Sequence, residues 1–173
     1  HGDPNYVHTI NDEYAQTEQR VGLISDKLAS WLIRKGYIAL SQSDNALLVE
    51  NTFDFTTKTS VLPHKTIAVL SGIGYIGKNN LFITTEYGAA QCLGTVLTNA
   101  PLSIVKRHIK SPQCGKCNIC KDVCPQRVLN GVCWDINVSR DDIVNVYDCV
   151  TCLKCLVYCH KTQAYLKRAI KQD

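Results

Sequence analysis

The stretch CGKCNICKDVCPQ, residues 114–126, sets four cysteines and a proline within a few turns of chain. Its spacing, C-x2-C-x2-C-x3-C-P, returns without the proline in CVTCLKCLVYCH, residues 149–160. The cysteines of the two runs are Cys114, Cys117, Cys120 and Cys124, followed by Cys149, Cys152, Cys155 and Cys159. A motif repeated in this way predicts a compact module with two equivalent metal sites.

The spacing within each run is typical of a protein that holds two [4Fe–4S] clusters. Three thiolates separated by two residues each can surround one cluster, while the fourth, three residues further on, reaches the other cluster. We therefore predict crossed ligand sets. One cluster takes Cys114, Cys117, Cys120 and Cys159. The other takes Cys149, Cys152, Cys155 and Cys124.

Two other uses of these cysteines fit the spacing less well. In a disulfide framework, three thiols separated by only two residues each would be too crowded to pair with distant cysteines. Structural zinc takes four ligands per ion, usually as paired C-x2-C units, and would leave the third and fourth cysteines of each run redundant. Pro125 follows the first run, whereas His160 stands at the matching position of the second. Because proline ligates nothing, this departure leaves the cluster assignment intact.

The remaining two cysteines are not expected to be primary ligands. Cys92 lies in an alternating, β-rich stretch where a small buried thiol is the common explanation. Cys133 lies in the connection between the two runs and stays open as an alternative ligand.

The rest of the chain predicts an α+β fold with α/β character. Apolar residues recur at helical spacing across residues 20–35, with Gly36 as a stop before a short strand at 37–40. We expect a strand with polar loops in 44–60, a helix from Pro63 to about Gly72, and two strands around a turn at 86–90. A last helix covers 161–170. This order predicts a first domain over 1–103 and a ferredoxin-like module over 104–173.

Composition is that of a globular protein. The 173 residues are 45% hydrophobic and 20% charged, and the formal net charge is +4. The basic residues are scattered, so they do not predict a nucleic-acid-binding arm. No apolar run approaches the roughly 18 residues of a membrane span, so we expect no membrane partner. Cluster thiolates decay in air, which predicts a cytoplasmic, anaerobic setting.

The stretch SGIGYIGKNNL, residues 71–81, is the most informative one without cysteine. A helix, not a strand, is expected to lead into it, which opposes a dinucleotide site, and Asn79 after Lys78 opposes a Walker A loop. Its glycines would let backbone N–H groups approach a ligand, with Lys78 as a cation for an anionic group. A tight structural turn explains the glycines equally well.

Residues 62–102, followed by the doubled cysteine run, resemble the epoxyqueuosine reductase family and, more closely, its shorter double-cluster iron–sulfur relatives. The resemblance covers roughly residues 20–170. It implies a cobalamin-binding α/β domain fused to a ferredoxin-like domain, an architecture shared with reductive dehalogenases. Enzymes of the family remove an epoxide from a modified tRNA nucleoside and leave an alkene.

The resemblance also implies a cofactor site at the glycine loop. The positions that match the family motif, and would contact cobalamin, are Gly72, Gly74, Tyr75, Ile76, Gly77, Lys78 and Asn79. His64 begins the predicted helix before this loop, so a cofactor contact and a capping role both stay open for it. The eight cysteines of the two runs match the family's ligands one for one.

The chain departs from the family at the proton donor. An ungapped register puts Lys58 or Thr59 where the epoxide enzymes carry aspartic acid, and neither replaces a carboxylic acid at neutral pH. Asp54 is near enough for a register shift to recruit it, but we do not assign it. The chain is also shorter than those enzymes and shows no C-terminal repeat for holding tRNA. We therefore do not expect tRNA as a partner.

The leading functional prediction is an iron–sulfur reductase that relays electrons through two clusters to a bound cobalamin. A ferredoxin or flavodoxin would donate the electrons, and the substrate would be a small molecule or a nucleoside. The first alternative is a pure electron-transfer protein or subunit without a corrinoid. A cluster-based sensor or structural module is the second.

Overall fold

The structure is a computed structural model that describes residues 8–104 and 106–171. Short strands and helices are mixed along the chain, so the α+β class is confirmed in this coarse form. The chain divides into two compact units. The cysteine unit consists in the main of Ala68–Gln91 and Arg107–Asp173, and the sheet unit of Thr9–Ile67 and Cys92–Lys106. Each is described by itself.

These units are interleaved in sequence, unlike the predicted contiguous domains 1–103 and 104–173. The glycine loop at 72–79 groups with the cysteine runs because its side chains and backbone pack on them, as described below. The predicted domain boundary therefore stays a prediction about independent folding, distinct from this division by contacts.

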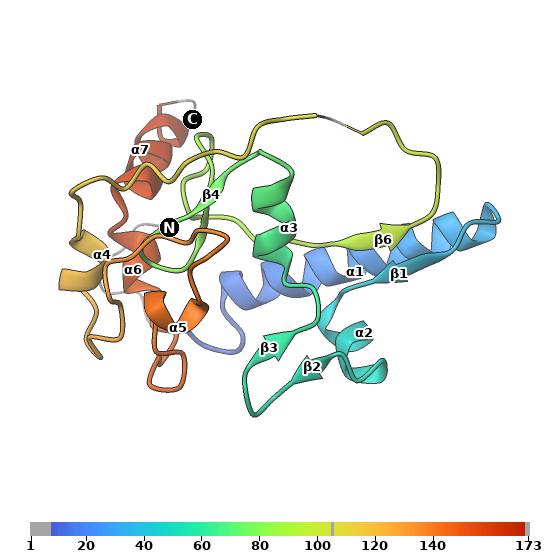
Figure 1. Ribbon diagram of the computed structural model, residues 1–173, viewed down its shortest axis with the longest axis horizontal. Helices are drawn as coiled ribbons and strands as arrows, with labels where there is room; N and C mark the ends of the chain where they lie inside the picture. The colour runs from blue at the N-terminus through green and yellow to red at the C-terminus, as the bar shows by residue number, and fades with distance from the viewer. Residues whose placement is uncertain (1–7, 105, 172–173) are drawn as a thin grey trace. The chain divides into compact units, whose positions relative to one another are not determined.

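The sheet unit is built on a long helix packed against a two-stranded sheet. Helix α1, Glu13–Arg34, lies along β1, Ala39–Ser41, and β6, Val96–Thr98 (Figure 1). β1 and β6 are antiparallel, with Ala39 opposite Thr98. The helix begins earlier than the sequence predicts because the Asp12 carboxylate accepts a hydrogen bond from the Ala15 N–H at 2.9 Å and caps it.

Residues 44–60 form a helix and a hairpin, where the sequence predicted a strand with polar loops. Helix α2, Asp44–Val49, begins after Ser43, whose hydroxyl accepts a hydrogen bond from the Ala46 N–H at 3.2 Å. The expectation of no helix here was wrong because this N-cap, followed by Ala and Leu, outweighs the polar composition. Strands β2, Phe53–Asp54, and β3, Thr59–Ser60, make the hairpin.

The two strands expected around residues 86–90 exist but do not pair with each other. β5, Phe82–Ile83, pairs with β4, Tyr75–Ile76, whereas β6 pairs with β1. The predicted pairing was wrong because the turn closes after a single bridge between Thr84 and Gly88. The predicted helix after Pro63 is confirmed as α3, His64–Leu70, and the division between the units falls within it.

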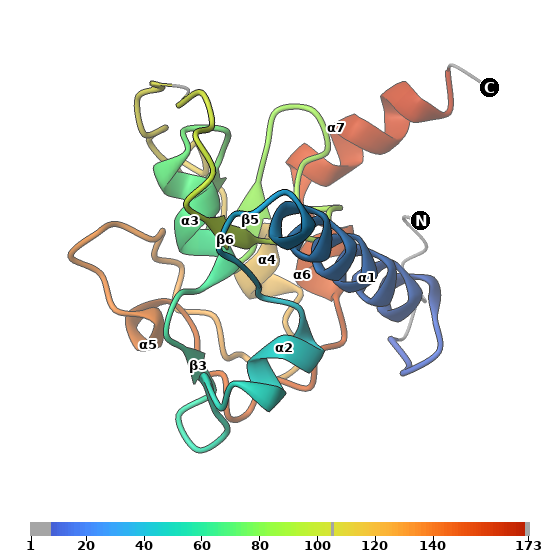
Figure 2. The same ribbon diagram turned by 90° about the vertical axis from the view of Figure 1, so that its right-hand side faces the viewer.

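The cysteine unit repeats one local structure. Helices α4, Ile119–Asp122, and α6, Lys154–Val157, are single turns that carry the third cysteine of each run, and they pack on each other (Figure 2). The fourth cysteine comes directly after each helix's C-cap. Helix α5, Arg140–Ile143, lies in the connection, and α7, His160–Ala169, confirms the predicted last helix. Within the described residues, no helix is both long and apolar enough to cross a membrane.

Candidate iron–sulfur site

One predicted ligand set lines a single small cavity in the cysteine unit. Its cysteines are Cys114, Cys117, Cys120 and Cys159. The rest of the lining comes from the glycine loop and from the ends of short elements: Lys78, Asn79, Ile83, Ile119, His160 and Lys161. The cavity thus joins three thiols of the first run with the last thiol of the second. We call it the first cluster cavity.

The second predicted set gathers around Cys155. Burial raises the pKa of the Cys155 thiol to about 12, and the neighbouring thiols act on it in the same direction. Those neighbours are Cys120, Cys149, Cys152 and Cys124. An apolar cluster of Val128, Leu129 and Val144 packs against Cys120, Cys124 and Cys155. Members of both runs are therefore brought together here as well.

The described thiols do not converge on the position of a single metal ion. All ten cysteines are free, and no three His, Cys, Asp or Glu side chains in residues 8–104 and 106–171 converge as ligands of one ion. Zinc requires that convergence, with each sulfur about 2.3 Å from the ion. In a cluster each cysteine binds its own iron, so thiols spread around a cavity fit. Burial also raises the pKa of the Cys120 thiol to about 11, so a metal bound there would have to displace a proton.

The glycine loop holds the cysteine segment through Lys78 and Asn79. The Lys78 ammonium donates to the Gly115 carbonyl at 2.9 Å and to Asn118 Oδ1 at 3.0 Å. The buried Asn79 amide donates to the Cys155 carbonyl at 3.3 Å. Lys78 thus donates two hydrogen bonds to the loop that follows Cys114, and Asn79 donates one to the second cysteine run.

The glycines of this loop are required by packing within the unit. A Cβ on Gly77 would lie 2.5 Å from Ile83 Cδ1 and 3.3 Å from Cys114 Sγ. A Cβ on Gly74 would meet the Ile83 carbonyl, and Gly72 has φ +72°. The side on which a Cβ would lie is therefore filled by the chain at these glycines. This packing explains Gly74 and Gly77 without a ligand, and the assignment of cobalamin contacts to Gly72, Gly74 and Gly77 stays a prediction.

Tyr75 and Ile76 are the buried apolar members of the loop, at 4% and 3% exposure. Both lie in β4, where Tyr75 stands opposite Ile83 and Ile76 opposite Phe82. Tyr75 forms a core cluster with Ile83 and Ala89, and Cys114 and Cys159 pack against that cluster. The Tyr75 hydroxyl is also near enough to both cysteines to interact with them electrostatically.

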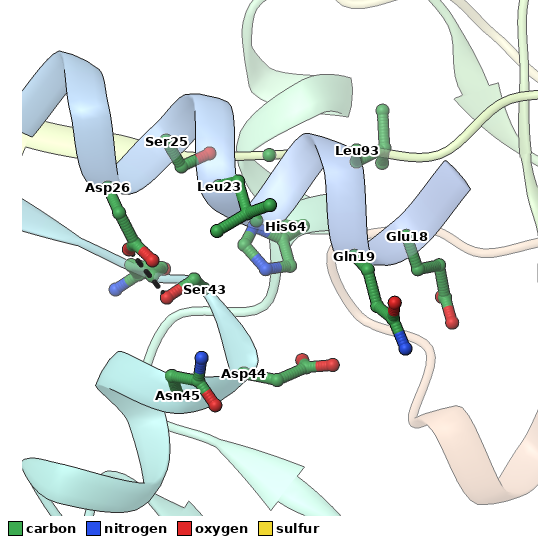
Figure 3. A pocket seen from close by; sticks show the side chains of 13 residues that line it. Glu18, Gln19, Leu23, Ser25, Asp26, Ser43, Asp44, Asn45, His64 and Leu93 are labelled. Atoms are coloured by element: carbon green, nitrogen blue, oxygen red, sulfur yellow. Dashed lines mark hydrogen bonds between the residues drawn. The ribbon is translucent and has the colours of Figure 1, made fainter. Parts of the chain in front are cut away.

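His64 lies in the sheet unit, at a second cavity of about 490 Å³ (Figure 3). Its Nδ1 is 2.7 Å from the Thr95 hydroxyl, and the ring also hydrogen-bonds the Gln42 backbone carbonyl. Burial lowers the pKa of His64, so the ring is neutral and fully used by these partners. This arrangement favours the structural role over a cofactor contact.

The lining of this second cavity is polar and acidic. Glu18, Asp26 and Asp44 contribute carboxylates, and the Ser43 hydroxyl donates to Asp26 at 2.7 Å (Figure 3). No Lys or Arg is among its described lining residues. The cavity therefore suits hydrogen-bond donors and cations, not a phosphate.

The proton-donor position falls in the β2–β3 hairpin. Lys58 has φ +51° in the turn, and Thr59 is the first residue of β3. Hydrogen bonds from Thr57 and from the Thr56 N–H hold the pKa of the exposed Asp54 carboxyl below its usual value. Asp54 is thus a carboxylate at neutral pH and a poor proton donor.

Cys133 is a neighbour of Cys114 that the cysteine spacing did not predict. Its thiol hydrogen-bonds Cys114, and burial followed by the Cys114 interaction raises the pKa of Cys133 to about 11. Nothing in the sequence could have signalled this contact beyond the bare presence of a cysteine in the connection, because the turns that bring it back are irregular.

Curated proteins of one kind are similar to parts of this chain. The chain is 28% identical over 132 residues to the epoxyqueuosine reductase of Lactococcus garvieae, covering 73% of this chain and 36% of the relative. It is 41% identical over 71 residues to that of Atelocyanobacterium thalassa, covering 41% and 23%. The chain is similar to epoxyqueuosine reductases. It spans well under half the length of these relatives. No family model matches it.

Solved structures agree at the level of the fold. An epoxyqueuosine reductase with a tRNA-Tyr epoxyqueuosine-modified stem loop matches 81% of this chain and 37% of its own, with a TM-score of 0.57 and 21% identity. The enzyme from Streptococcus thermophilus matches 82% and 39%, with a TM-score of 0.55 and 23% identity.

The first of these structures corrects one expectation. We did not expect tRNA as a partner, yet the structural relative was solved with a tRNA stem loop. The prediction was wrong because it rested on where this sequence ends, and that does not bear on whether a protein of this kind binds tRNA.

Proposed function

We propose that this chain is an iron–sulfur redox protein of the epoxyqueuosine reductase type, which relays single electrons through two [4Fe–4S] clusters to a reductive reaction. The observation that carries the proposal is the first cluster cavity, where Cys114, Cys117 and Cys120 meet Cys159 from the other run. The similarity to epoxyqueuosine reductases and the ten cysteines favour the same class of cofactor.

The chain's residues would divide the work as follows. The two crossed cysteine sets hold the clusters, and the one-turn helices α4 and α6 fix the third thiol of each set. Lys78 and Asn79 tie the glycine loop to the first and second runs, respectively. Clusters supply one-electron transfer, and the protein tunes their potentials through hydrogen bonds and burial.

Cobalamin is the part of the proposal that rests on resemblance. The packing around Gly74 and Gly77 explains these glycines without a ligand, so we derive no step through a corrinoid. The same packing favours the second candidate, an electron-transfer protein or subunit without a corrinoid. Anaerobic titration with cob(II)alamin separates them, since a protein-bound, base-off cobalt EPR signal at about one equivalent supports the first and an unchanged signal supports the second.

The experiment for the function itself uses the reconstituted chain with dithionite and an epoxyqueuosine-containing tRNA stem loop. Conversion of the epoxide to the alkene would establish a reductase. Reduction of both clusters without conversion, with or without added cobalamin, would support the electron carrier. A chain that takes up no clusters would refute both.

A further inference from the structure

Tyr75 carries a polar atom that the cysteine unit buries without a partner. The residue is 4% exposed and sits in β4, among Ile83, Ala89, Cys114 and Cys159. Its hydroxyl is fully buried and makes no hydrogen bond with the described residues. The Gln113 N–H points toward it without reaching ordinary hydrogen-bond geometry. Leaving such a group unpaired destabilises the folded state, and native proteins rarely do so.

Three cysteine thiols lie near this hydroxyl. Cys114, Cys159 and Cys133 all lie near enough to interact with it electrostatically. Cys114 and Cys159 also line the first cluster cavity, and both pack against the core cluster that Tyr75 forms with Ile83 and Ala89. A neutral thiol is a weak acceptor, whereas a thiolate bound to iron, or a cluster sulfide, carries negative charge and accepts a charge-assisted hydrogen bond. The missing partner is thus of the kind that a cluster supplies.

We propose that the Tyr75 hydroxyl donates a hydrogen bond to a sulfur atom at the first cluster cavity and thereby raises the reduction potential of that cluster. This inference rests on the proposed function, since it requires the cluster. The physical reason is charge. Adding one electron makes the cluster more negative, so the same hydrogen bond is stronger in the reduced state than in the oxidised state. Tyr75 is a positioning residue in this proposal; it exchanges no electron or proton.

The test compares the reconstituted wild-type chain with Tyr75→Phe, which removes one oxygen and keeps the ring packing. EPR-monitored redox titration follows both clusters. We expect the ratio of oxidised to reduced first cluster at a fixed potential to rise about tenfold, equivalent to about 59 mV downward for a one-electron couple. The second cluster should be unchanged. Tyr165→Phe is the matched control, because the Tyr165 ring meets the Tyr87 ring edge to face, with 5.5 Å between the ring centroids, and Tyr165 is not among the described residues that line the cavity.

Two further variants make each outcome decisive. Incorporating 3-fluorotyrosine at position 75 strengthens the donor and should shift the potential upward, which tests the proposal even if Tyr75→Phe fails to fold. Cys133→Ala asks whether the hydroxyl serves that thiol instead: the effect of Tyr75→Phe should persist in this background. Unchanged potentials in both Tyr75 variants, or an effect that vanishes with Cys133, would overturn the proposal. Absence of clusters from the wild type would instead refute the proposed function.

Discussion

Gly88 meets two requirements that an added methyl group would violate: a left-handed backbone conformation and a close approach to the backbone of α7. It has φ +60°, and a Cβ there would lie 2.6 Å from the Lys161 carbonyl carbon and from Thr162 Cα, both in the backbone of α7. The neighbouring Ala89 N–H donates to the buried Thr162 hydroxyl at 3.1 Å. Because backbone atoms cannot rotate away, Gly88→Ala must push α7 and this turn apart.

The expected cost has two parts. A non-glycine residue in the left-handed region costs about 1–2 kcal/mol, and overpacking against a rigid neighbour costs about 1–3 kcal/mol. Gly115→Ala is the matched control, since Gly115 has φ +52° in the same unit but nothing within 4 Å of its added Cβ. Only the first part applies to it.

The assay is anaerobic thermal unfolding of the reconstituted protein, combined with iron content. In a chain of this size 1 kcal/mol corresponds to about 2–4 °C, so the steric part predicts a midpoint about 2–12 °C lower for Gly88→Ala than for Gly115→Ala. Since α7 begins directly after Cys159, iron loss should affect the first cluster preferentially. Equal midpoints for the two variants would refute the packing argument.

Three other perturbations follow from the site. Lys78→Met removes the hydrogen-bond donors to Gly115 and Asn118 and should lower the occupancy of the first cluster in iron and EPR measurements. If Lys78 served only to bind an anionic ligand, cluster occupancy would be unchanged. Cys159→Ser should lose about one cluster per chain by the same measurements, and Cys92→Ser in the sheet unit should lose none. Burial lowers the pKa of His64, so the unfolded chain binds more protons and stability falls as pH drops below about 6.5. His64→Asn should flatten that part of the pH–stability curve, and an identical slope would contradict the assignment.

Local signals predicted the parts of the structure that local chemistry controls. The cysteine spacing predicted that Cys114, Cys117, Cys120 and Cys159 lie together, and these four line one cavity because short loops and single helical turns bring them there. That they bind a cluster stays a prediction. Helix α7 likewise followed from its own sequence.

Long-range pairing was beyond the sequence. β6 pairs with β1 across more than fifty residues, and no feature of either strand's sequence indicates which strand it pairs with. The turn at 86–90 suggested a nearer partner for β6, but the chain leaves the ladder after the Thr84–Gly88 bridge.

The role of the glycine loop was open for the same reason. Gly77 reads equally as a ligand cradle or a packing site until Ile83 and Cys114 are seen to fill the space beside it. The partnerless hydroxyl of Tyr75 is visible only once its neighbours are known.

The most direct measurement is the iron and acid-labile sulfide content of the anaerobically purified chain, read together with EPR of the dithionite-reduced protein. We expect about eight irons and eight sulfides per chain, with the signals of two interacting [4Fe–4S] clusters. Stoichiometric zinc without sulfide, or cysteines joined in disulfides with no iron after reconstitution, would contradict the two-cluster proposal.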